Sequence, residues 1–119
     1  MTYLVVWDRK PVTVVQMATF TRDVASVWSE AELAAFVDYI ARNPEAGDIV
    51  QGTGGVRKIR WAAKGKGKRG GARVIYFFYN PNNPVYLVSI YAKNERETIS
   101  EADRKLYARM SEDIKGKLK

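Results

Sequence analysis

The chain has 119 residues, 46% of them hydrophobic and 12% aromatic, so we expect one globular domain spanning residues 1–119. It has no cysteine, which excludes disulfides and thiolate metal sites, and no histidine, which removes the commonest general base and transition-metal ligand. We therefore expect no metal and no cofactor, and catalysis would have to use Lys, Arg, Tyr, Asp, Glu, Ser or Thr. The apolar runs are far shorter than the ~20 residues of a membrane helix, and the lack of cysteine fits a reducing cytoplasm.

The net charge of +7 is concentrated in one region. Between Ile49 and Asn94 there are nine basic residues and no acidic residue, whereas the remainder has eleven basic and thirteen acidic residues. Most of the excess lies in residues 52–73, GTGGVRKIRWAAKGKGKRGGAR, where eight of the 22 positions are basic and seven are glycine. This asymmetry predicts a polyanionic partner, nucleic acid first, and the alternative is a basic face that serves solubility.

The first part of the chain predicts a strand followed by helices. Residues 13–20, TVVQMATF, are β-branched and partly alternating, which indicates a strand. Residues 22–28 favour a short helix that pairs with the next one as a hairpin. Ser29 and Glu32 have the spacing of a capping box, apolar residues follow at helical spacing, and Asn43-Pro44 ends the run, so a helix is predicted over 30–42.

The second part predicts three strands and a helix. The strands are 56–62, 72–80 and 85–93, and the turn PNNP joins the last two as a hairpin. A capping signature begins at Ser100, and an apolar stripe follows at Leu106, Met110 and Ile114. The order predicts an α+β domain with helices packed on a small antiparallel sheet of about four strands.

The loop KGKGKRGG (64–71) contains the spacing GxGxxG, which also occurs in dinucleotide-binding folds. Here the segment that follows it is strand-like, and no acidic residue lies about 20 positions further on, so a dinucleotide site is disfavoured. Glycines also let a backbone approach a phosphodiester closely, and lysines neutralise the phosphates.

Strand alternation divides the basic strand 56–62 into two faces. Lys58 and Arg60 share one face, and Arg57, Ile59 and Trp61 share the other.

The predicted hairpin brings further cations to one edge of the sheet. Arg73 lies at its entry and Lys93 at its exit, so antiparallel pairing places them together, beside the loop lysines. We expect a compact cationic site there. Most aromatic residues of the sheet should be core, and Tyr91 is the best candidate for an exposed ring that stacks on a base.

The segment GDIVQGTGGVRKIRWAAKGKGKRGGARVIYFFYN, followed by VYLVSIYAKNE, resembles the HigB-like branch of the RelE/ParE toxins of bacterial type II toxin–antitoxin modules, from about Thr19 to Met110. The resemblance implies a small sheet with two N-terminal helices. It also implies an endonuclease that enters the ribosomal A site and cleaves the mRNA there. In that reaction the ribose 2′-hydroxyl attacks the adjacent phosphate. The implied partner is a cognate antitoxin with a helix-turn-helix DNA-binding domain.

The resemblance also implies roles for individual residues. Arg73 matches the arginine that contacts the scissile phosphate, Lys58 and Arg60 match a basic pair on the preceding strand, and Lys93 matches the basic end of the last strand. RelE itself carries a tyrosine that helps activate the 2′-hydroxyl, and the corresponding stretch of this chain, ETISEAD, has none. The general base would then be a loop lysine with a lowered pKa or, second, Tyr91. The expected catalytic residues are Arg73, Lys58, Arg60, Lys66, Lys68, Lys93 and Tyr91, and the expected RNA-binding residues are Arg57, Lys64, Arg69 and Trp61.

Two other functions remain open at this stage. One is that of a ParE-like toxin, which poisons DNA gyrase with no nuclease chemistry. The other is a non-catalytic nucleic-acid-binding module, for which the basic loop would suffice and whose affinity would fall steeply with salt.

Overall fold

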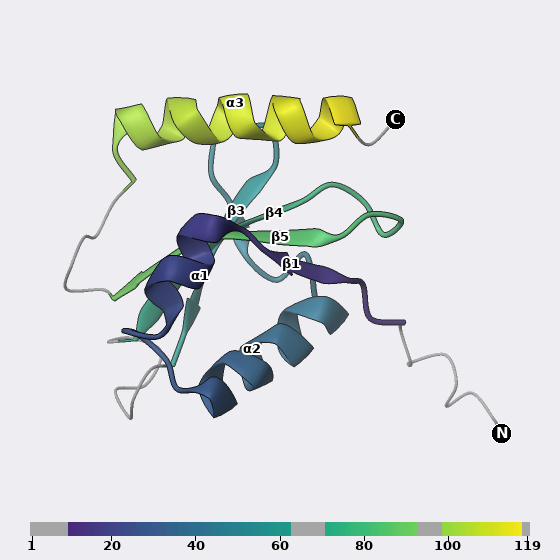
Figure 1. Cartoon of the computed structure of the whole chain (residues 1–119). Helices are drawn as coiled ribbons and strands as arrows, with labels where there is room; N and C mark the ends of the chain where they lie inside the picture. The colour runs from purple at the N-terminus through teal and green to yellow at the C-terminus, as the bar shows by residue number, and fades with distance from the viewer. Residues whose placement is uncertain (1–9, 63–70, 93–98, 118–119) are drawn as a thin grey trace, which may run out of the picture.

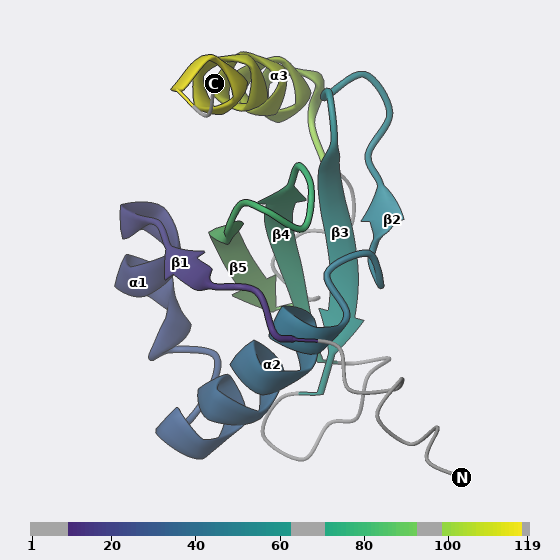
Figure 2. The ribbon, with the colours of Figure 1, turned by 90° about the vertical axis from the view of Figure 1, so that its right-hand side faces the viewer.

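A five-stranded sheet separates two layers of helices in the computed structural model, which describes residues 10–62, 71–92 and 99–117. Figure 1 shows the two N-terminal helices on one side of the sheet and the C-terminal helix on the other, and Figure 2 shows the same layers after a 90° turn. In chain order the elements are β1 (Val14–Gln16), α1 (Ala18–Val24), α2 (Glu30–Arg42), β2 (Asp48–Ile49), β3 (Val56–Trp61), β4 (Ala72–Phe78), β5 (Val85–Ala92) and α3 (Glu101–Lys117).

The sheet has the strand order β1-β5-β4-β3-β2. Its centre is the predicted antiparallel meander of β3, β4 and β5, while β1 joins one edge parallel to β5. The α+β class is confirmed. The fifth strand, missed in the sequence, is the two-residue β2, which pairs with β3 at the other edge.

The capping box predicted for α2 is confirmed. The amide of Glu32 donates to Ser29 Oγ at 3.1 Å, and the amide of Ser29 donates to the Glu32 carboxylate at 2.7 Å. These bonds satisfy two amides that a helix start would otherwise leave unpaired, so the helix begins at Glu30.

The strand predicted over 13–20 is wrong in its second half, since β1 ends at Gln16 and α1 begins at Ala18. The helix predicted over 22–28 therefore lies four residues earlier. Tertiary contacts outweigh the β-branched composition here: Phe20 and Val24, one helical turn apart, are both buried against the sheet, and the Thr19 hydroxyl donates to the carbonyl of Val88.

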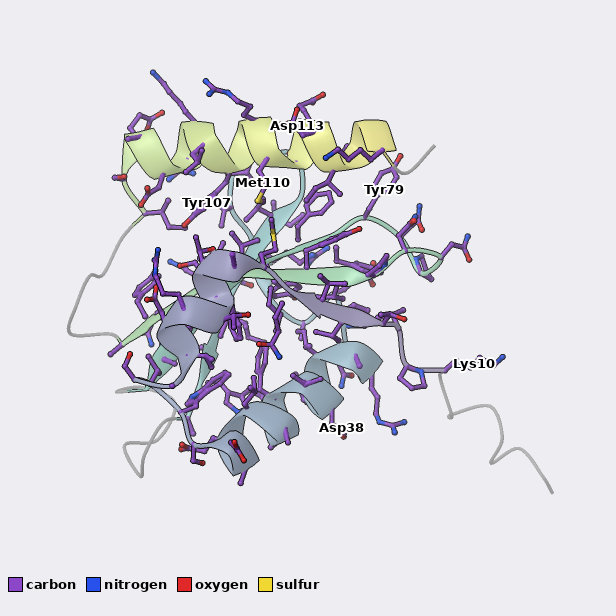
Figure 3. The ribbon with its side chains drawn as sticks, viewed as in Figure 1. Lys10, Asp38, Tyr79, Tyr107, Met110 and Asp113 are labelled. Atoms are coloured by element: carbon purple, nitrogen blue, oxygen red, sulfur yellow. The ribbon has the colours of Figure 1, made fainter. Side chains whose placement is uncertain are left out.

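Each face of the sheet has its own hydrophobic core. The face under α1 and α2 buries Phe20, Phe36 and Ile40 against alternate residues of β4 and β5. The face under α3 buries Val56, Ile75, Phe77 and Val88 with Tyr107, and Met110 and Ile114 pack onto this cluster. Figure 3 shows Tyr107 and Met110 on the side of α3 that faces the sheet.

The apolar stripe predicted for α3 is wrong at its first position. Leu106 is 56% exposed, and Tyr107 occupies the buried position instead. The helix therefore presents Tyr107, Met110, Ser111 and Ile114 to the sheet, a stripe that includes a polar residue.

Candidate functional site

Three side chains form a row across the central strands, on the face that α3 partly covers. Arg60 on β3 is the direct partner of Arg73 on β4, and Arg73 is the direct partner of Tyr91 on β5. Lys58 lies two residues before Arg60 and therefore on the same face, about 6.6 Å further along the strand. We call the three cations Lys58, Arg60 and Arg73 the cationic row, and Tyr91 adjoins it on β5.

Arg73 is the most constrained member of the cationic row. Its side chain is only 7% exposed, and its buried Nη1 has no hydrogen-bond partner among the described residues. An unpaired N–H on a buried guanidinium is costly in free energy, and a bound anion would supply the missing acceptor. Arg60 opposite it is exposed and strengthens the local positive potential.

Among the described residues, no carboxylate forms an ion pair with this row, although Asp48 on β2 is the register partner of Lys58. The ion pairs of the described parts lie elsewhere, at Arg22–Asp23, Arg42–Asp38 and Arg104–Glu101, and none includes Lys58, Arg60 or Arg73. The row lies where β3 and β5 end and β4 begins. The other predicted site residues, Lys64, Lys66, Lys68, Arg69 and Lys93, fall outside the described residues.

Trp61 lies on the opposite face, under α2. Its ring centroid is 5.3 Å from that of Phe36 and 4.9 Å from that of Tyr39, so it belongs to an aromatic cluster of the core. Trp28 packs in the same layer and donates from its indole to the carbonyl of Ala62 at 2.8 Å, which anchors the chain just after β3. The structure therefore does not place Trp61 with the cationic row.

Arg57 also lies on the α2 face. Its Nη1 donates to the carbonyls of Glu45 at 3.1 Å and Gly47 at 2.8 Å. These bonds hold the loop between α2 and β2 against β3, so the guanidinium has a structural role there and is not part of the cationic row.

The comparison with family models identifies the chain. The model of the RelE toxin of the RelE/RelB toxin–antitoxin system matches residues 13–118 of the 119. The chain belongs to the RelE toxin family. It is therefore a toxin of a toxin–antitoxin system, and the family implies a cognate antitoxin as its partner.

The expectation of an exposed Tyr91 is wrong for this RelE-family toxin. Tyr91 is 4% exposed and belongs to the core cluster beneath α3. Tyr79, the residue directly after β4, is 48% exposed (Figure 3). Its ring centroid lies 5.8 Å from Lys115 Nζ. Tyr91 can still contact a group bound at Arg73, since the two residues are register partners, but it cannot act as an open stacking surface.

The GTGG segment of this RelE-family toxin contacts α3. Ser111 Oγ donates to the carbonyl of Thr53 at 2.6 Å, and Arg104 Nη1 donates to the carbonyl of Gln51 at 2.7 Å. Gly54 has a φ of +76°, and a Cβ there would lie 2.7 Å from Ser111 Oγ. These glycines therefore serve the packing of α3 against the β2–β3 loop.

Sequence reasoning missed Arg104 and Ser111. They lie seven residues apart, two helical turns, and so share a face of α3 with Tyr107. That spacing was visible in the sequence, but it does not reveal which loop the face meets.

In residues 10–62, 71–92 and 99–117, no three acidic side chains are grouped so that they could hold a metal ion. In the same ranges, no helix is long and apolar enough to cross a bilayer.

Proposed function

We propose that this RelE-family toxin is a HigB-like, ribosome-dependent mRNA endonuclease that acts in the cytoplasm. The observation that carries the proposal is the buried Arg73 with its unpartnered Nη1, opposite Arg60 and beside Lys58. Such a site suits the phosphate of a single-stranded RNA, because one planar guanidinium group can donate two parallel hydrogen bonds to two phosphate oxygens.

The proposed reaction is a transesterification within the RNA. The 2′-oxygen forms a bond to the adjacent phosphorus, the bond from phosphorus to the 5′-oxygen breaks, and a 2′,3′-cyclic phosphate and a 5′-hydroxyl result. Negative charge accumulates on the non-bridging oxygens in the transition state. Arg73 and Arg60 stabilise that charge, an effect whose removal typically costs about 10²–10³ in rate.

Two protons move in this reaction. A base takes the proton of the 2′-hydroxyl, and an acid delivers one to the leaving 5′-oxygen. Tyr91 is the base candidate within the described residues, because it faces Arg73 from β5. The loop lysines Lys66 and Lys68 are the other candidates, and Lys93 supplies further positive charge.

The ribosome has a positioning role in this proposal. Without histidine the site has no ready-made base at neutral pH, so alignment of the 2′-hydroxyl with the phosphate must supply much of the acceleration. Lys64 and Arg69 would bind RNA phosphates around the cleaved position. The cognate antitoxin, with a helix-turn-helix domain, would block this cationic site.

The test is cell-free bacterial translation with purified toxin, followed by mapping of mRNA 5′ ends by primer extension. We expect new ends within codons, only when ribosomes are present, and their loss with Arg73→Ala. Arg22→Ala is the matched control, since Arg22 is an exposed arginine of α1 on the opposite side of the sheet. Intact mRNA with the wild-type toxin would overturn the proposal, and a supercoiling assay would then test gyrase as the target.

A further inference from the structure

A surface cavity of about 380 Å³ lies next to the cationic row, between the edge strand β2 and the start of α3. Its apolar walls are Ile49, Val50 and Ile99. Lys58 lines it as well, so one side chain belongs both to this cavity and to the cationic row. The volume lies near the lower end of the range for ligand pockets and suits a single base or nucleoside.

The guanidinium of Arg104 is fixed on the α3 side of this cavity. Its Nη1 donates to the carbonyl of Gln51 at 2.7 Å, and its Nε lies 3.8 Å from the Glu101 carboxylate. A guanidinium has five N–H donors in one plane, so these two contacts leave donors for a ligand. A fixed guanidinium plane is also a surface on which RNA bases stack.

Asp48 gives the cavity an acidic group opposite these cations. It lies on β2 as the direct partner of Lys58, and no described cation forms an ion pair with it. Its negative charge disfavours a phosphate in the cavity, whereas the neighbouring cationic row favours one. A carboxylate is instead a good acceptor for the amino group of a base, as in contacts between Asp or Glu and cytosine.

We propose that this cavity binds the base of the nucleotide next to the scissile phosphate, and that Asp48 selects bases with an exocyclic amino group. The proposal rests on the nuclease function proposed above. If the phosphate lies at Arg73 and Arg60, Lys58 is about 6.6 Å from Arg60 along β3. That distance is comparable to the spacing of successive nucleotides in an extended RNA chain. The base then enters between Ile49 and Ile99, stacks on Arg104, and donates from its amino group to Asp48.

The first experiment measures base preference at the cut. A set of mRNAs that differ only in the nucleotide next to the cleaved phosphate is translated with the toxin, and cleavage at A, C, G and U is compared. We expect the three amino-bearing bases to be cleaved about tenfold faster than uracil. Asp48→Asn should reduce that ratio to about twofold, because an amide can donate to the uracil carbonyl. Asp113→Asn on α3 is the control and should keep the wild-type ratio.

A second measurement does not depend on cleavage. The ¹⁵N-labelled full chain is titrated with CMP and with UMP, and amide shifts of Ile49, Gln51 and Ile99 are followed. We expect CMP to shift these amides at lower concentration than UMP, and Arg104→Ala, but not Arg109→Ala, to abolish the shifts.

The two measurements separate this inference from the function on which it rests. Cleavage with equal base preference in the wild type and Asp48→Asn would overturn the cavity's role alone. Shifts with CMP in a toxin that leaves mRNA intact would support the cavity and overturn the nuclease. No CMP shifts in the wild type would overturn the inference, whether or not the toxin cleaves mRNA.

Discussion

Arg60 on β3 and Arg73 on β4 are direct partners in an antiparallel pair, on the face of the sheet that α3 partly covers. Like charges directly opposite each other destabilise a sheet, by an amount comparable to the 0.2–1 kcal/mol of a favourable pair. The burial of Arg73 adds a desolvation cost, and its buried Nη1 has no partner among the described residues. Stability alone would favour apolar residues here, and the phosphate-binding role proposed above would require both cations.

The first prediction is that stability and activity separate at Arg73. Arg73→Met keeps much of the side-chain volume and removes the buried charge, so the free energy of unfolding should stay equal or rise by about 1–3 kcal/mol. Cleavage in translation extracts should fall by about 10²–10³. Urea denaturation and primer extension measure the two effects, and an unfolded or fully active variant would contradict the assignment.

A second prediction concerns the two faces of β3. Trp61→Ala removes a ring that packs against Phe36 and Tyr39, and should lower the free energy of unfolding by about 3–5 kcal/mol. Cleavage per folded molecule should be unchanged, because Trp61 lies on the face opposite Arg60 and Arg73. The cleavage assay uses Trp61→Phe, which keeps an aromatic ring and should therefore be more stable than Trp61→Ala. If Trp61→Phe is fully folded but no longer cleaves RNA, Trp61 contributes to the RNA site and this prediction is wrong.

Elements with local signals were predictable from the sequence, and elements decided by distant contacts were not. The capping box at Ser29 and the stop at Pro44 define α2 within its own residues. The helix α1 depends on the burial of Phe20 and Val24 against strands that are distant in the sequence. The residues of α1 alone do not predict that burial.

The same division applies to the site. Alternation along β3 correctly puts Lys58 and Arg60 on one face. The register that pairs Arg60 with Arg73 depends on how the intervening loop closes, and the burial of Tyr91 depends on α3, which is remote in sequence. For the same reason Arg104, on that helix, could not be linked to Lys58 before the structure was known.

A third prediction tests the contact between α3 and the GTGG segment with two glycines. Gly54→Ala should destabilise the fold by about 1–3 kcal/mol, because φ is +76° and the new Cβ would meet Ser111 Oγ at 2.7 Å. Gly116→Ala, at a position in α3 with no atom within 4 Å of the added Cβ, should stabilise it by about 0.5–1 kcal/mol. Thermal unfolding compares the two, and equal melting temperatures would show that the contact is weak in solution.

The fourth prediction concerns Tyr76, whose buried hydroxyl donates to the carbonyl of Pro44 and accepts from the amide of Gly47, both at 2.8 Å. Tyr76→Phe leaves those two groups without this partner and should cost about 1–3 kcal/mol in the free energy of unfolding. Urea denaturation at pH 8 measures the loss. The RNA site is on the other face, so cleavage per folded molecule should persist.

The pH dependence gives this prediction a second, independent check. Burial raises the pKa of Tyr76 from 10.0 to about 12, so the folded state keeps the phenolic proton over a range in which the unfolded state loses it. The stabilisation is therefore fully present below pH 10 and is lost as the pH rises towards 12. The difference in free energy of unfolding between the wild type and Tyr76→Phe should accordingly shrink between pH 9 and pH 11.5. A constant difference across that range would mean that the Tyr76 hydroxyl titrates normally and is not held between Pro44 and Gly47.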